Sequence, residues 1–266
     1  GRRGVREGAA DLAPVPGPGV QLAGGLKKQL PGGGRVGFDP WRQAAGQMTS
    51  VTRDLEGSGI TLLQCGNLVD RIWQDQPAPP MQPVTAHPIE YAGESAADKC
   101  ARLAKDLRDA GQAAAVITLP DSIMWLLNIR GSDIPRNPVA HGFAILHSDA
   151  RVDLFMDPSK LEGLADHLGA GVTVHPPAGF LNAVGALNGA VAVDRDSLPQ
   201  IVAETLGDRL QPTGDPCALP KACKNAAEIE GSAAAHLRDG AAVVELLAWL
   251  DDQAPGSITE IDVVKQ

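Results

Sequence analysis

The sequence predicts an α/β fold in which helices flank a mixed β-sheet. Between residues 95 and 210, helical and strand patterns alternate along the chain. Residues 113–119 form an apolar run typical of a buried strand, and the Ser148-Asp149-Ala150 turn separates two further runs that are expected to pair. Alternation of this kind favours helices layered on a sheet.

The first thirty-four residues are rich in glycine and proline and show little periodicity. Composition alone is compatible with a flexible leader. The alternative, which we favour, is the degraded or cut remainder of a first domain, and we expect a chain that opens on Gly1 to have lost its beginning. The N-terminus has no apolar segment typical of a secretory signal.

Residues 35–64 carry a strand, a helix and a second strand. Residues 35–38 read as the first strand, and Asp39 can cap a helix that has Pro40 at its first position and runs to about Glu56. Residues 60–64 return as a strand. Five prolines between residues 75 and 88 predict a stiff, extended connector, and a domain boundary is expected near Gly93.

A second domain then begins at Ser95, which starts a helix with an acidic residue in its first turn. Its expected elements are, in order, a helix from Ser95 to Gly111, a strand at 113–119, paired strands at 142–146 and 152–156, a helix at 160–168, a strand at 172–175, a helix at 180–187, a strand at 190–193 and a helix at 199–210.

Beyond Pro220 the pattern becomes purely helical. Asn225 and Glu228 have the spacing of a capping box, and apolar residues then recur at helical spacing to about Gln253. A further helix start follows at residues 257–260. Such a stripe cannot bury itself, so residues 226–266 are expected to self-associate unless something covers them.

Composition excludes several classes of partner. The formal net charge is -9 and the pI is near 5.1, whereas nucleic acids and anionic membranes require a basic surface. No apolar run approaches the roughly 18 residues of a membrane span. We therefore expect a cytoplasmic protein that binds neither nucleic acid nor membrane, with its four scattered cysteines reduced.

The segment 123–146 carries the clearest functional signal. A loop between two apolar runs is expected to present Arg130, Ser132, Asp133 and Arg136 at its tip. Functional residues collect on loops that rigid elements hold, although an ordinary connection with a solvated tip has the same spacing.

No catalytic or metal-binding motif is present. The six histidines form no HExxH pattern and are expected to be structural or superficial. Gly131-Ser132 lacks the flanking residues of a nucleophile elbow, and residues 32–34 lack the Lys-Ser/Thr of a phosphate loop. We assign no catalytic residue and no metal ligand to this chain.

A set of short strings is distributed along residues 36–266: GFDPW at 37–41, IW at 72–73, QPAPP at 76–80, HP at 87–88, YAGES at 91–95, the segment 123–146, PKA at 220–222, KN at 224–225, EIEG at 228–231, AHLRDG at 235–240 and TEID at 259–262. These strings, in this order, resemble the three-domain Xaa-Pro aminopeptidases of the creatinase, prolidase and methionine-aminopeptidase family.

This resemblance implies a domain organisation. Residues 1–92 would be a partial first creatinase-like domain with its connector, and residues 93–222 a second such domain with a ribonuclease-H-like mixed sheet. Residues 223–266 would be the first helices of a truncated pita-bread catalytic domain.

The resemblance also implies a function, the release of the N-terminal residue from Xaa-Pro peptides by a metallo-aminopeptidase. In the complete enzyme, two divalent ions, manganese by expectation, would be held by two aspartates, a histidine and two glutamates. None of those motifs occurs before Gln266, so we expect this chain alone to be inactive and to bind no metal.

Two further expectations follow from the resemblance. The complete enzyme would be a homodimer acting on proline-containing peptides, with Arg130 and Asp133 adjacent to the substrate. The alternative is a non-catalytic creatinase-like module that binds a partner or dimerises.

Overall fold

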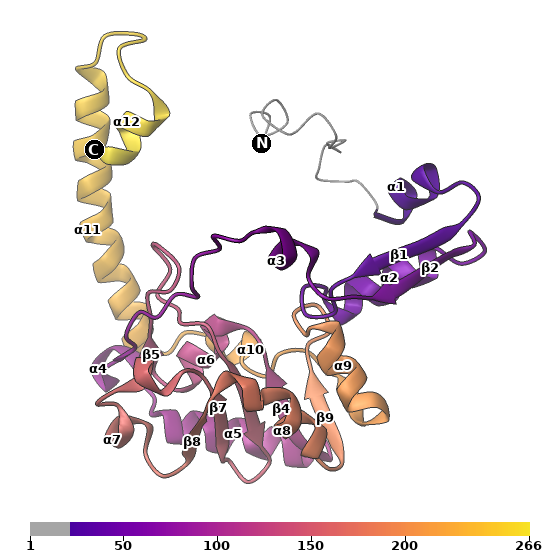
Figure 1. The fold of residues 1–266 in the computed structure, drawn as a ribbon. Helices are drawn as coiled ribbons and strands as arrows, with labels where there is room; N and C mark the ends of the chain where they lie inside the picture. The colour runs from indigo at the N-terminus through magenta and orange to yellow at the C-terminus, as the bar shows by residue number, and fades with distance from the viewer. Residues whose placement is uncertain (1–21) are drawn as a thin grey trace.

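The computed structural model of the chain describes residues 22–266 and contains two packed units and a long C-terminal helix (Figure 1). The first unit, residues 22–66, has the helix α1 (Leu22–Gln29), strand β1 (Gly34–Phe38), helix α2 (Ala45–Asp54) and strand β2 (Ile60–Gln64). The strands are parallel, with Gly34 opposite Ile60. A small core of Ala23, Val51, Leu55 and Ile60 joins α1 and α2 to them.

Of the segment interpreted as a leader or a first-domain remnant, residues 1–21 lie outside the described residues. The remainder, residues 22–34, is not a free leader, because α1 buries Ala23 in the core of the first unit.

The helix predicted from Asp39 begins only at Ala45, so the predicted start is wrong. Asp39 forms a tight turn instead, in which its carboxylate accepts a hydrogen bond from the Trp41 backbone N–H at 2.9 Å. The N–H groups of Ala45 and Gly46 donate to carbonyl oxygens of the second domain, those of Leu198 and Arg195, each at 2.8 Å. Long-range hydrogen bonds therefore fix where α2 begins.

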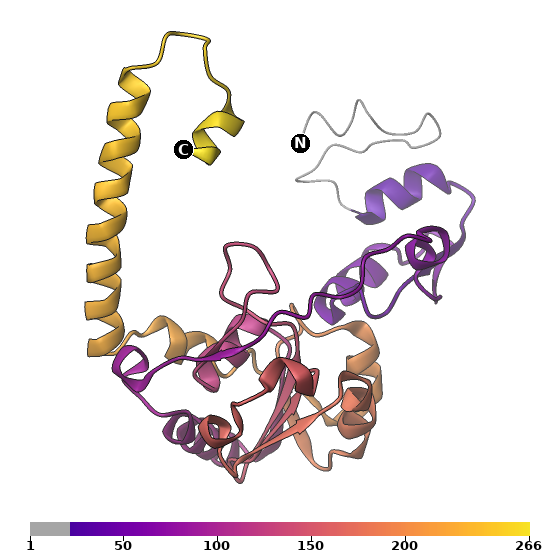
Figure 2. The same ribbon diagram turned by 60° about the vertical axis from the view of Figure 1, so that its left-hand side comes forward.

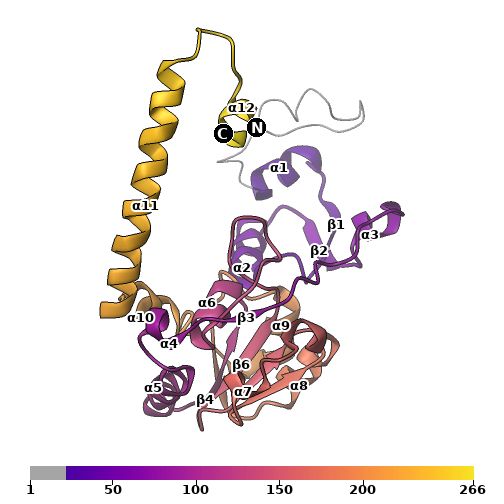
Figure 3. The same cartoon turned by 90° about the vertical axis from the view of Figure 1, so that its left-hand side faces the viewer.

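Four main-chain hydrogen bonds join the first unit to the second domain. In addition to the two above, the Gln200 N–H donates to Gln43 at 2.8 Å and the Ile201 N–H donates to Pro40 at 3.1 Å. Trp41 adds an aromatic contact, with its ring centroid 6.2 Å from that of Phe143. The first unit therefore lies on the second domain beside α9 (Gln200–Leu206) (Figure 3).

The proline-rich connector is extended over most of its length, as predicted. After the short helix α3 (Leu68–Ile72), the chain runs without a helix to strand β3 (Thr85–Ala86), which pairs antiparallel with β5 (Ile129–Arg130). Helix α4 (Ile89–Ala92) then ends at Gly93, whose φ of 68° is the left-handed conformation that favours glycine.

The second domain is built on a six-stranded mixed sheet with the order β10-β9-β4-β6-β7-β8. The strands are β4 (Gln112–Ile117), β6 (Phe143–His147), β7 (Val152–Phe155), β8 (Val172–His175), β9 (Ala190–Val193) and β10 (Leu210–Pro212). Strands β10, β9 and β4 are parallel, β6 is antiparallel to both β4 and β7, and β8 is parallel to β7. The predicted mixed sheet flanked by helices is confirmed.

Helices cover both faces of this sheet. Helices α5 (Ala96–Asp109) and α6 (Pro120–Leu126) contribute to the core on one face, whereas α8 (Phe180–Ala186) and α9 contribute to the other. The alternation of strand side chains decides the division: Ala115 and Ile117 of β4 face the first core, and Ala114 and Val116 face the second.

Two predicted helix boundaries in this domain are wrong. The expected helix at 160–168 is divided into the 3-10 turn η1 (Pro158–Leu161) and α7 (Ala165–Leu168), with Gly163 at φ 77° between them. The expected helix at 199–210 ends at Leu206, because Gly207 takes φ 55° and a 3-10 turn, η3 (Gly207–Arg209), leads into β10. The apolar run near residue 123 lies within α6, which starts earlier, at Pro120.

The 3-10 turn η2 (Pro177–Gly179) precedes α8.

The C-terminal segment that follows β10 consists of three helices. Helix α10 (Ala218–Ala222) precedes α11 (Ala226–Asp251), and α12 (Glu260–Lys265) follows. Only the start of α11 lies against the rest of the fold, at α4 and α6, and the remainder of the helix stands away from it (Figures 1 and 2). No residue of α11 is buried. None of the helices within residues 22–266 has the length and apolarity needed to cross a bilayer.

Candidate functional site

A groove of about 490 Å³ lies where α11 meets the second domain. Its lining comes from four places in the sequence: helix α6, strand β5 with the loop that follows it, the residues around α4, and the junction of α10 with α11. Among its residues are His87, Trp125, Arg130, Lys224 and Glu228. The groove therefore combines apolar surface with charges of both signs.

The first turn of α11 is closed by a capping box whose asparagine also bonds to α4. The Asn225 side chain accepts from the Glu228 N–H at 3.0 Å, and the Glu228 carboxylate accepts from the Asn225 N–H at 2.9 Å. The Asn225 amide also donates to the Ala92 carbonyl at 2.8 Å. A side chain at Gly93 would collide with Asn225, since its Cβ would lie 2.3 Å from Oδ1.

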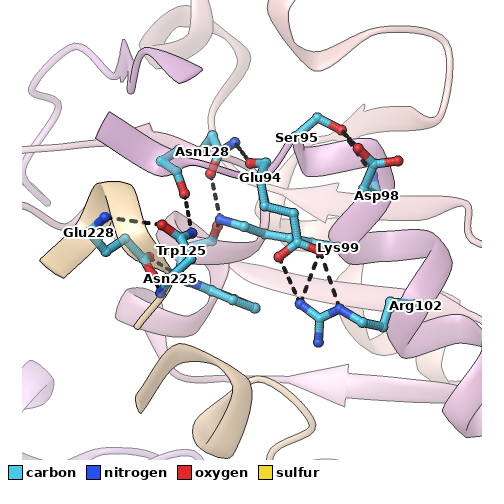
Figure 4. Close-up of polar contacts among 10 residues, drawn as sticks. Glu94, Ser95, Asp98, Lys99, Arg102, Trp125, Asn128, Asn225 and Glu228 are labelled. Atoms are coloured by element: carbon cyan, nitrogen blue, oxygen red, sulfur yellow. Dashed lines mark hydrogen bonds and ion pairs between the residues drawn. The ribbon is translucent and has the colours of Figure 1, made fainter. Parts of the chain in front are cut away.

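Glu228 has a second partner, which links the cap to α6. The Trp125 indole N–H donates to Glu228 Oε1 at 3.3 Å (Figure 4). One carboxylate thus caps α11 and holds the indole that forms part of the groove.

Lys99 lies behind this indole as a buried cation. The residue is 1% exposed, and its ammonium donates to the Trp125 carbonyl at 3.0 Å and to Asn128 Oδ1 at 2.7 Å. The ammonium also lies 4.3 Å from the centroid of the Trp125 ring, a cation–π contact. Burial lowers the pKa of Lys99, although the carboxylates of Glu228 and Glu94 oppose this shift.

Asn128 connects this cation to the surrounding loops. Its φ of 51° is left-handed, a conformation that asparagine tolerates better than most residues. Its side chain donates to the Glu94 carbonyl at 2.8 Å, and its own carbonyl accepts from the His87 N–H at 2.7 Å and lies 2.8 Å from His167 Nε2.

Arg130, one of the two predicted site residues, lines the groove. Its Nη1 donates to the carbonyls of Ile129 at 2.8 Å and Met124 at 3.2 Å, so main-chain atoms hold the guanidinium. The ion pairs within residues 22–266 do not include it. Burial lowers the pKa of Arg130, and burial together with the charges of Arg130 and Lys99 lowers the pKa of His87.

Asp133, the other predicted residue, is not at an exposed loop tip, so that expectation is wrong. Its side chain is fully buried and pairs with the ammonium of Lys160, while Oδ2 accepts from the His141 N–H at 2.7 Å. Burial by itself would raise the pKa of Asp133, but the hydrogen bonds from Lys160 and His141 lower it overall. Ser132 and Arg136 are exposed, as expected. The loop is therefore anchored from within by an ion pair.

Two histidines share a carboxylate on the other side of the sheet. His147 Nε2 lies 2.7 Å from Asp153 Oδ2, and His175 Nε2 lies 2.8 Å from Asp153 Oδ1. The neighbouring strands β6, β7 and β8 bring these three residues together. Both carboxylate oxygens are engaged, and within residues 22–266 no group of three or more His, Cys, Asp and Glu residues is arranged to hold a metal ion.

The cysteines form no disulfide in the described chain. Burial raises the pKa of Cys100 to about 11, and burial next to Asp215 raises that of Cys217. A raised pKa lowers the share of the reactive thiolate form in both residues.

Sequence reasoning missed Lys99, Trp125 and Asn128. One signal was available, because Lys99 falls on the same helical face as Leu103 and Leu107, where a charged residue is rare. Trp125 and Asn128 gave no comparable signal, because their roles depend on contacts with residues 94–99 and 225–228.

Comparison with known proteins places this site in a family. A sequence model of the creatinase/prolidase N-terminal domain matches residues 75–228. The chain belongs to the creatinase/prolidase N-terminal domain family. The matched region includes the connector, the whole six-stranded sheet and the capping box of α11.

Individual relatives extend the similarity beyond this creatinase/prolidase domain. A probable Xaa-Pro aminopeptidase P of Coccidioides posadasii is 36% identical over 253 residues, which are 89% of this chain and 39% of the relative. Another from Aspergillus clavatus is 36% identical over 252 residues, with 89% and 38% covered. The chain spans about two fifths of the length of these relatives.

A solved structure agrees with this relationship. The X-prolyl aminopeptidase of Caenorhabditis elegans, described as a cytosolic enzyme with a di-nuclear active site, is 28% identical and has a TM-score of 0.84 over 97% of this chain and 43% of its own. The resemblance to Xaa-Pro aminopeptidases and the predicted fold class are both confirmed.

Proposed function

We propose that this chain is the amino-terminal part of a proline-specific metallo-aminopeptidase that releases the N-terminal residue from Xaa-Pro peptides. The observation that carries the proposal is the extent of the structural similarity, which covers 97% of the chain and so includes α11 as well as the creatinase/prolidase domain. A shared sheet alone would support only a shared fold.

Within this proposal, residues 1–92 form a partial first domain with its connector, residues 93–222 a second domain, and residues 223–266 the start of the catalytic domain. The anchored first turn of α11 and the unpartnered remainder of that helix support the last boundary. We further propose a cytoplasmic homodimer.

The complete enzyme would use two divalent ions, by expectation manganese. The described residues do not fit such a pair, since they offer no cluster of three metal-ligating side chains. The ligands would therefore come from another part of the protein. What this chain supplies is a groove with a fixed arginine next to the helix that leads into that part.

The two loop residues take different roles in this proposal. Arg130 lies in the groove and would be adjacent to the peptide. Asp133 is buried with Lys160 and would act by holding the loop that carries Arg130.

The test is an assay of the complete protein encoded by the same gene. With manganese present it should cleave Ala-Pro-Ala between the first two residues and leave Ala-Ala-Ala intact, and the 266-residue chain alone should cleave neither. Failure of the complete protein to cleave Ala-Pro-Ala would overturn the proposal.

That failure would favour a second candidate, a non-catalytic creatinase-like module that binds or dimerises. The observation in its favour is the exposed apolar surface of α11, including Ile229, Leu237 and Val244.

A further inference from the structure

We infer that the groove at the start of α11 binds the carboxylate end of a short peptide, with Arg130 as the group that meets the carboxylate. The inference rests on the proposed function only in taking peptides as the ligand. The site itself is argued from the charges, hydrogen bonds and apolar surface of the groove.

Arg130 is a positioned cation that forms no ion pair with any residue of the described range 22–266, and Glu228 is the carboxylate whose charge acts on it. Its Nη1 is held by two main-chain carbonyls. A half-buried guanidinium without an ion-pair partner is unfavourable in free energy. A carboxylate matches the planar arrangement of its N–H donors better than water does. The partner that it lacks is therefore an anion.

The rest of the groove has the same electrostatic preference. Lys224 lies in the groove and forms no ion pair with the described residues, and Lys221 is paired with Asp121. Glu228 accepts hydrogen bonds from Asn225 and Trp125, which leave its negative charge in place, and that charge acts on Arg130. The lining still holds one more cation than carboxylate, since Arg130, Lys221 and Lys224 stand against Asp121 and Glu228. In a chain whose net charge is -9, a groove with a surplus of cations is selective for an anionic group.

The buried ammonium of Lys99 strengthens this preference. It lies directly behind the Trp125 ring, and no carboxylate within residues 22–266 forms an ion pair with it. Low-polarity surroundings screen its field less than water would. The carboxylate site thus has a second fixed cation that solvent does not reach.

Apolar surface in the same groove indicates that the anion belongs to a larger molecule. Met124, Trp125, Pro138 and Val139 contribute to its wall, next to Arg130. A free inorganic anion would leave this wall uncovered, whereas a peptide would cover it with side chains and place its terminal carboxylate on the guanidinium. The volume of about 490 Å³ is in the range of small-molecule sites.

Calorimetric titration of the 266-residue chain with Ala-Pro-Ala and with its C-terminal amide tests the inference without any variant. The free acid should bind about ten- to a hundred-fold more tightly than the amide, as expected for one charge-assisted hydrogen-bonded pair. Equal binding, or no binding of either peptide, would overturn the inference. Acetate should bind far more weakly than the free acid of Ala-Pro-Ala. Equal affinity of the two would show that the groove binds small anions in general and not the end of a peptide, which would overturn the inference.

Two variants assign the effect to a residue. Arg130→Met should remove the preference for the acid, whereas Arg136→Met, which removes the same charge from the exposed part of the same loop, should retain it. Thermal unfolding of both variants checks that they are folded, and Arg130→Lys should retain part of the preference. Because binding is measured without catalysis, a loss of acid preference and a failure of peptide cleavage are separate results.

Discussion

Three charged residues of the second domain are kept from water in different ways. Lys99 is satisfied by a carbonyl, an amide oxygen and an aromatic ring, and Arg130 by two carbonyls. Asp133 instead has a full counter-ion in Lys160. They should therefore respond differently to substitution, because only Asp133 leaves an opposite charge behind when it is removed.

Replacing Asp133 by alanine should lower the free energy of unfolding by about 3–5 kcal/mol, because Lys160 would remain buried without its partner. Urea denaturation measures this. Asp149→Ala is the matched control, since its pair with Arg151 is exposed and should contribute no more than about 1 kcal/mol. Equal stability of the two variants would show that the buried pair is not an anchor.

Asp153 should make stability depend on acid pH. Burial alone would raise its pKa, but the hydrogen bonds from His147 and His175 outweigh burial and hold the pKa below its ordinary value of 3.8. A lowered folded-state pKa contributes stability above the unfolded value, and this contribution disappears as the pH falls through the folded value.

The variant Asp153→Asn should therefore be less stable than the parent at neutral pH by about 1–2 kcal/mol, and the difference should close below pH 3.8. Thermal unfolding across the pH range gives both curves. A difference that persists unchanged in acid would assign the effect to packing and not to charge.

At the scale of elements, the sequence predicted the start of a helix correctly where a side chain at that start caps the helix. Ser95, Asn225 and Thr259 each accept a bond from the backbone N–H three residues later, and all three were expected near helix starts. The start of α2 could not be predicted in this way, because its first N–H groups donate to Leu198 and Arg195, about 150 residues away. Strands at 60–64, 172–175 and 190–193 were confirmed, since their apolar patterns are local too.

Asn225 makes two hydrogen bonds that position α11: it accepts one from the Glu228 N–H and donates one to the Ala92 carbonyl. Asn225→Ala should cost about 1–2 kcal/mol, because it removes the cap acceptor and the bond to the Ala92 carbonyl. Hydrogen exchange of the first α11 amides should also increase. Asn67→Ala, which removes the cap of the exposed helix α3, should cost less, and a larger effect there would contradict a special role for the junction.

Gly131 allows the two sides of the Arg130 loop to approach one another. An added Cβ would lie 2.6 Å from the Ala140 nitrogen, which is main chain and cannot easily move. Gly131→Ala should destabilise the protein by about 1–3 kcal/mol. Gly171→Ala, where a Cβ meets no atom within 4 Å, serves as the control in the same denaturation experiment.

At the scale of the whole molecule, the surface of α11 stands out. This helix of 26 residues buries none of them, and Leu237 and Val244 are among its exposed apolar side chains. The sequence predicted both the stripe and its tendency to associate. It did not predict the groove at the base of the helix, because Trp125, Arg130 and Glu228 meet there only through the tertiary fold.

The double variant Leu237→Lys with Val244→Lys should weaken self-association about tenfold, because it removes apolar surface that a second molecule could cover. Light scattering over a concentration series measures this. Ala234→Lys with Ala242→Lys adds the same charge to the same helix and should have a smaller effect. A deletion of residues 224–266 would remove the same apolar surface, but it would also remove Asn225 and Glu228 at the groove, so the two substitutions are the cleaner test.

The attachment of the first unit through main-chain atoms has a consequence for how this architecture can change over time. The four hydrogen bonds between residues 40–46 and 195–201 use only backbone groups, which every residue except proline can donate and every residue can accept. Most side chains in the two segments can therefore change without altering how the two units are oriented. The exceptions are Gly46, where a Cβ would lie 2.8 Å from Asp196 Oδ1, and Trp41, which packs on Phe143. Chimaeras that exchange the first unit between distant relatives should keep the same mutual orientation, provided that the exchanged segments preserve their lengths.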